Sequence, residues 1–88
     1  MSEVSEIMSG SVKLKFADTY EENCKMLVKK LTNGFGVLTD WESDSGRRVY
    51  YTHPEYPGYE FTIRTWNVSE FNDNSVLIHY TVFREKLT

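Results

Sequence analysis

A helical pattern of apolar residues occurs in only one stretch of this chain, Thr19 to Asn33. Apolar side chains recur there at spacings of three and four residues, which lines them up as one stripe on a helix surface. The stripe consists of Tyr20, Cys24, Leu27, Val28 and Leu31. Thr19 and Glu22 have the spacing of a capping box, and Gly34 can take the left-handed conformation that ends a helix. The sequence therefore predicts one helix, whose stripe must pack against other elements.

The rest of the chain alternates apolar and polar residues, a pattern typical of β-strands with one buried face. Strands are predicted at 11–17, 37–42, 47–52, 59–66 and 76–84, with a loop at 67–75. Both sides of the last strand are largely apolar, so we expect it inside the sheet. Parallel strands would need more crossover helices than the chain contains. We predict a single α+β domain over 11–88, with the helix packed on one face of a four- to five-stranded antiparallel sheet in the order β-α-β-β-β-β.

This order of elements also occurs in cystatin-like and monellin-like proteins. The sequence contains none of the cystatin inhibitory motifs, so the order assigns no family. The function has to be argued from the residues themselves.

The first ten residues lack a sustained pattern, because Val4, Ile7 and Met8 do not alternate. We predict a flexible N-terminal tail over 1–10, without the basic and apolar runs of a signal peptide. No stretch approaches the roughly 20 apolar residues that span a bilayer, so no membrane partner is expected. The single cysteine, Cys24, cannot form an internal disulfide, and its place in the helix stripe predicts a buried thiol. A cytoplasmic location is expected, since the fold does not depend on oxidation.

Motifs that would indicate an enzyme or a metal site are absent from the sequence: it has no phosphate-binding loop, CxxC pair, HExxH helix or GxSxG turn. His53 and His79 are the only histidines, and their spacing matches no compact set of metal ligands. We expect no metal, no cofactor and no catalytic residues. A small nuclease that uses these histidines with Arg48 or Arg64 for acid–base catalysis is a further hypothesis.

Alternation divides the predicted sheet into two faces. The face toward the helix is predicted to carry Val12, Leu14, Phe16, Phe61, Ile63, Val76, Ile78 and Tyr80. The opposite face is predicted to carry nine cationic, aromatic or apolar residues, which we call the candidate residues: Lys13, Lys15, Arg48, Tyr50, Arg64, Trp66, Leu77, His79 and Phe83. The alternative is that this face is not open to a partner, because the first ten residues or the loop at 53–58 cover it.

Rings and cations on one face fit two kinds of partner. Trp, Tyr and Arg are common anchors of protein interfaces, and aromatic rings with cations also hold single-stranded RNA or DNA. The net charge of −3 favours protein contact, because nucleic-acid-binding domains usually carry excess positive charge. We therefore predict a non-enzymatic inhibitor or adaptor that binds another protein and a second copy of itself. A single-stranded RNA- or DNA-binding module is the alternative.

Overall fold

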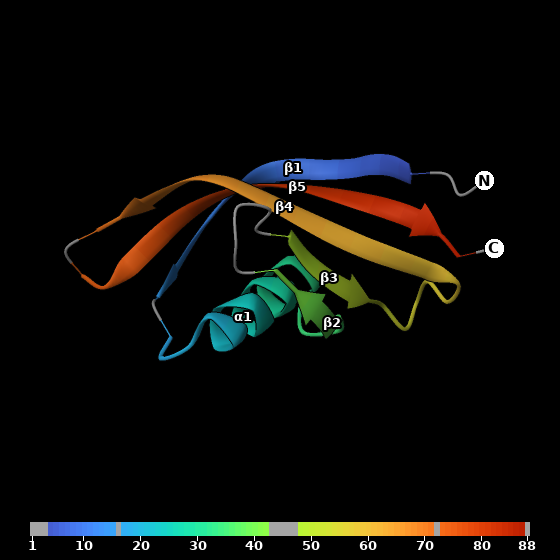
Figure 1. The fold of residues 1–88 in the computed structure, drawn as a ribbon, viewed down its shortest axis with the longest axis horizontal. Coiled ribbons are helices and arrows are strands. Elements are labelled where there is room, and N and C mark those ends of the chain that lie inside the picture. The colour runs from blue at the N-terminus through green and yellow to red at the C-terminus, as the bar shows by residue number, and fades with distance from the viewer. Residues whose placement is uncertain (1–3, 16, 43–47, 72, 88) are drawn as a thin grey trace.

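The computed structural model of this 88-residue chain describes residues 4–15, 17–42, 48–71 and 73–87 (Figure 1). Its elements are β1 (Val4–Lys15), α1 (Tyr20–Thr32), β2 (Val37–Trp41), β3 (Arg48–Thr52), β4 (Tyr59–Glu70) and β5 (Ser75–Lys86). The strands form one antiparallel sheet in the order β1-β5-β4-β3-β2, and α1 lies along one side of it (Figure 1). The predicted α+β fold is confirmed, and β5 is flanked on both sides, as expected.

The helix begins and ends where its capping residues predict. The Glu22 N–H donates to the Thr19 hydroxyl at 3.2 Å, which satisfies one donor that the first turn leaves without a backbone partner. At the other end Asn33 and Gly34 both have positive φ angles, 55° and 88°. The Gly34 N–H then donates to the carbonyl of Lys29 at 2.8 Å, which closes the last turn.

Replacing Thr19 with alanine is expected to lower the free energy of unfolding by about 1 kcal/mol, because the cap is lost and the helix gains nothing in return. Urea denaturation followed by circular dichroism measures the change. Lys30→Ala is the control, since Lys30 is an exposed residue of the same helix. An equal loss in both variants would contradict the role of the cap.

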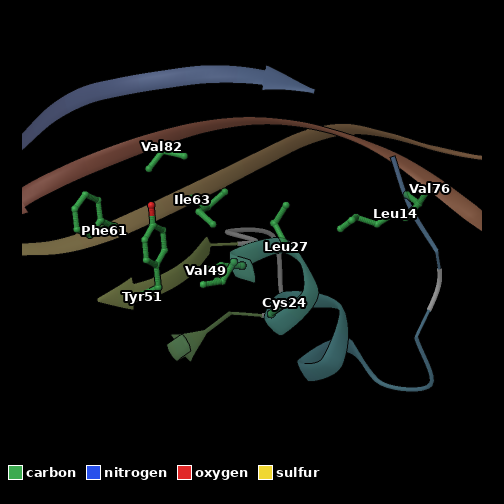
Figure 2. Close-up of a cluster of buried hydrophobic side chains, with 10 residues drawn as sticks. Leu14, Cys24, Leu27, Val49, Tyr51, Phe61, Ile63, Val76 and Val82 are labelled. Atoms are coloured by element: carbon green, nitrogen blue, oxygen red, sulfur yellow. The ribbon is translucent and has the colours of Figure 1, made fainter. Parts of the chain in front are cut away.

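Between the helix and the sheet lies the hydrophobic core (Figure 2). Its buried members are Leu14, Cys24, Leu27, Val28, Val49, Tyr51, Phe61, Ile63, Val76 and Val82. The predicted stripe supplies Cys24, Leu27 and Val28 from α1. The Cys24 thiol is buried as predicted, and this burial raises its pKa. Removing these side chains from water is the main stabilising contribution that such a sheet and helix can make.

The buried side chain of Tyr51 is expected to make the fold less stable as the pH rises into the alkaline range. Its side chain is buried, and burial raises its pKa to about 12 from the ordinary value of 10.0. Between these values the folded protein keeps a proton that the unfolded chain releases, so the free energy of unfolding is expected to fall as the pH rises through this window. Urea denaturation at several pH values above 9 measures this slope, which Tyr51→Phe should make shallower. Equal slopes in both proteins would contradict the assignment.

The prediction of a flexible tail over 1–10 is wrong for residues 4–10, while residues 1–3 lie outside the described part of the chain. Residues 4–10 form the first part of β1, which pairs with β5 from Val4 opposite Glu85 to Gly10 opposite Tyr80. A bulge between Glu6 and Met8 shifts the register, so the apolar residues there do not alternate. This bulge hides the strand from a search for period-two patterns.

The loop predicted at 67–75 is also shorter than expected. β4 continues to Glu70 and β5 begins at Ser75, and the two strands stay paired beyond a register shift between Trp66 and Ser69. Their hairpin extends past the helix in Figure 1. Polar residues typical of loops predicted one here, whereas backbone pairing between the two strands continues through them. Phe16 and Arg47, which we placed in strands, lie outside the described residues.

Candidate functional site

The face of the sheet opposite α1, which we call the open face, carries all nine candidate residues. Residues directly opposite each other in paired strands point to the same side of a sheet. Cross-strand pairs of this kind join Lys13 to Leu77, Lys15 to Ser75, Arg48 to Arg64, Tyr50 to Thr62, Thr62 to Phe83 and Trp66 to His79. The predicted grouping is therefore present across β1, β5, β4 and β3. None of the nine is fully buried.

Neither segment that we considered as a cover lies across the open face. Residues 4–10 are part of β1 and extend the sheet sideways next to β5. The loop at 53–58 lies on the helix side, because the Tyr56 ring packs edge-on against the ring of Phe61 in the core, with the two ring centroids 6.0 Å apart. Neither of these two segments therefore covers the open face.

Two arginines and two aromatic rings line a shallow hollow of about 300 Å³ on the open face, here called the arginine hollow. Its lining residues are Val4, Arg48, Tyr50, Thr62, Arg64, Phe83 and Glu85. Arg48 and Arg64 stand directly opposite each other in β3 and β4, and like charges in this position repel. Among the described residues, neither forms an ion pair with a carboxylate. An anionic group from outside the chain would relieve this repulsion.

Tyr50 is fixed at the edge of the arginine hollow by a carboxylate. Its hydroxyl donates to Oε1 of Glu42 at 2.9 Å. This hydrogen bond is the main cause that raises the pKa of Tyr50, and the nearby Arg48 charge offsets part of it. This hydrogen bond gives the polar end of the Tyr50 ring a partner beside the hollow.

Beyond the hollow the open face continues with rings and lysines. Trp66 and His79 stack with centroids 6.4 Å apart and an angle of 27° between their planes. Lys13 lies with Nζ 4.8 Å from the centroid of Phe71 and 3.5 Å from Oδ2 of Asp73. A hydrogen bond from the Ser75 hydroxyl is the main cause that lowers the pKa of the Asp73 carboxyl. Lys13 thus has a carboxylate partner, whereas no carboxylate in the described ranges forms an ion pair with the arginines of the hollow.

Carboxylates, none of which is among the nine candidate residues, occupy one end of the open face. Glu6 stands opposite Phe83, and Glu85 stands opposite both Val4 and Glu60. Glu60 shares the alternation of Arg64, so the strand pattern was sufficient to find it. Glu85 lies one residue beyond the strand predicted at 76–84. Glu6 gave no such signal, because the bulge separates it from the regular part of β1. The charge of the open face therefore changes sign along the strands.

The two histidines do not form a joint site. His79 is on the open face beside Trp66, whereas His53 lies on the helix side with its ring 5.1 Å from that of Tyr56. A nuclease that uses both histidines together has no support in this geometry, because acid–base partners must reach the same substrate. Within 4–15, 17–42, 48–71 and 73–87, no three His, Cys, Asp or Glu side chains are grouped to hold a metal ion.

Comparisons of the chain with protein families, with curated proteins and with solved structures found no match. Across the described ranges, no helix combines the length and the hydrophobicity needed to cross a membrane. The function is therefore argued from the open face alone.

Proposed function

We propose that this protein is a non-enzymatic binding module that pairs with a second copy of itself through the open face. The observation that carries the proposal is the arginine hollow, where Arg48 and Arg64 converge without a carboxylate partner among the described residues. Rings of Tyr50 and Phe83 stand beside them. Apolar and aromatic residues surrounded by charges are typical of the contacts that hold protein interfaces together.

A second copy is favoured because the open face carries negative charge at one end and positive charge further along its strands. Carboxylates of Glu6, Glu60 and Glu85 lie at one end, the arginines come next along the strands, and Lys13 and Lys15 lie at the other end. A twofold axis parallel to the sheet and perpendicular to its strands, crossing them near Thr62 and Phe83, lays one open face on the other with the acidic end of one copy over the arginines of the other. Such an interface is self-complementary, since each contact occurs twice.

The size of the open face sets the upper limit of the contact between two copies. The molecule has extents of 44, 22 and 21 Å. A face as long as the molecule and as wide as one short axis offers about 900 Å², against roughly 800 Å² per partner in a standard protein interface. Thr62 and Phe83 lie between the carboxylates and the arginines, close to the axis of such a pair.

An inhibitor or adaptor that docks on a different protein would use the same residues, and so would a single strand of RNA or DNA. The carboxylates at one end disfavour a phosphate backbone, which is why we place nucleic acid second. A reducing compartment such as the cytoplasm suits the single buried thiol of Cys24.

Sedimentation velocity over a range of protein concentrations tests the proposal. We expect a dimer that persists in added salt and dissociates when Trp66 and Phe83 are both replaced by alanine. Phe35→Ala is the control, because Phe35 is an exposed ring on the other side of the molecule. A protein that stays monomeric at all concentrations contradicts the proposal. If that monomer also binds a single-stranded oligonucleotide with steep salt dependence, the nucleic-acid hypothesis replaces it.

A further inference from the structure

On the helix side of the sheet, a second cavity of about 420 Å³ lies between the start of β1, the end of α1 and the loop at 53–58. We call it the aromatic cavity. It is lined by Ile7, Met8, Leu31, Thr32, Asn33, Phe35, Tyr51, His53, Glu55, Tyr56 and Phe61. Its volume is within the range of small-molecule sites, which are mostly apolar with a few polar groups. None of its lining residues belongs to the candidate residues.

Five rings follow one another along the wall of this cavity. Tyr51 and Phe61 stack with centroids 4.9 Å apart, and both are buried (Figure 2). Tyr56 packs against Phe61, and His53 contacts both Tyr56 and Phe35, with centroids 5.1 to 6.0 Å apart. Phe35 and Tyr56 are 55% and 47% exposed, so the rings lead from an open rim to a buried floor. A flat apolar molecule would gain contact with ring surfaces along this path.

The Tyr51 hydroxyl supplies a hydrogen-bonding group at the floor. Tyr51 is only 3% exposed, and its hydroxyl has no hydrogen bond to any described residue. Every fully enclosed side-chain nitrogen or oxygen in the described ranges has a hydrogen-bond partner. The Tyr51 oxygen is therefore not fully enclosed, and the cavity that Tyr51 lines is the space open to it. A polar group that is nearly buried and has no partner among the described residues points to a partner from outside.

The polar groups of the cavity favour a ligand that accepts hydrogen bonds. Nδ1 of His53 accepts from the Glu55 N–H at 3.1 Å, so a neutral His53 ring carries its proton on Nε2 and is a donor there. The Thr32 hydroxyl has no proton for a ligand, since it donates to the carbonyl of Val28 and accepts from the Gly36 N–H, both at 2.7 Å. Within the described part of the chain, no lysine or arginine lines the cavity, and Glu55 disfavours an anion.

We propose that the aromatic cavity binds a small, uncharged, planar aromatic molecule that carries a hydrogen-bond acceptor. The ligand's acceptor accepts a hydrogen bond from the Tyr51 hydroxyl, and the ring of the ligand packs among Phe35, Tyr56 and Phe61. This site does not depend on pairing through the open face, because the two lie on opposite sides of the sheet.

Titration of the ¹⁵N-labelled full chain with 1-indanone and with indane tests the proposal. The two probes share one flat bicyclic shape, but only 1-indanone has a carbonyl acceptor. We expect saturable shifts of backbone resonances at Leu31 and Phe35 and little change at Arg64. Tyr51→Phe should weaken the binding of 1-indanone about five-fold, the effect of one hydrogen bond, and leave the affinity for indane unchanged.

Ile7→Trp gives a second test that does not involve the buried floor. Ile7 is 43% exposed at the rim, and the larger side chain should fill the entrance and weaken both probes at least ten-fold. Val37→Trp is the matched control, because Val37 is 59% exposed and lines neither the arginine hollow nor the aromatic cavity. Shifts centred on the open face, no saturation by either probe, or equal weakening of both probes by Tyr51→Phe would overturn the proposal.

Discussion

A chain in which Arg48 and Arg64 are both replaced by glutamate is expected to remain folded and to lose pairing entirely. The two side chains stand opposite each other, so two glutamates there repel about as two arginines do. Glu42 beside position 48 adds repulsion only at the surface, so the chain should still fold. In the pair, however, the new carboxylates would meet those of Glu60 and Glu85 from the other copy. Like charges brought together in an interface cost several kcal/mol, which is enough to remove a moderate affinity.

Sedimentation velocity measures the loss, and circular dichroism confirms that the variant is folded. Lys29→Glu with Lys30→Glu is the matched control, because it changes the net charge by the same amount on an exposed part of α1. The account is wrong if this control abolishes pairing as well, or if the double arginine variant pairs as the unaltered protein does.

Replacing Ile63 with alanine is expected to lower the free energy of unfolding by about 2–5 kcal/mol. Ile63 is fully buried in β4, with Val49 and Val82 opposite it in the neighbouring strands. The smaller side chain leaves a space that the surrounding core cannot fill without moving paired strands. A domain of this size has a modest core, so this loss is a large part of its stability.

Urea denaturation followed by circular dichroism measures the loss, and Ile7→Ala is its control. Ile7 is the same residue type in β1 but is 43% exposed, so its truncation should cost less than about 1 kcal/mol. Similar costs for the two variants would show that Ile63 is not at the centre of the core.

The helix and the open face could be predicted because their signals are local. Thr19 and Gly34 mark the ends of α1 through the chemistry of their own turns. Alternation alone then assigns Arg48, Arg64 and Phe83 to one side of the sheet, and the observed cross-strand pairs place them there. A period of two carries this information as long as the register is regular.

The remaining features depend on irregular backbone or on contacts between distant residues. The bulge after Glu6 broke the alternation, so neither the first part of β1 nor the acidic end of the open face was found in full. The aromatic cavity unites Ile7 with the rings of Phe35, His53 and Tyr56, which come from loops without any periodic pattern. Only the folded chain brings these residues together.

An exchange of charges between two variants tests most directly whether the open face pairs with itself. One variant carries Arg48→Glu and Arg64→Glu, and the other carries Glu60→Lys and Glu85→Lys. Each variant repels its own kind but is complementary to the other. We predict that each sediments alone as a monomer of 10.3 kDa or nearly so, and that their equimolar mixture sediments with about twice that mass. A mixture that remains monomeric, under conditions where the unaltered protein is a dimer, would contradict the account.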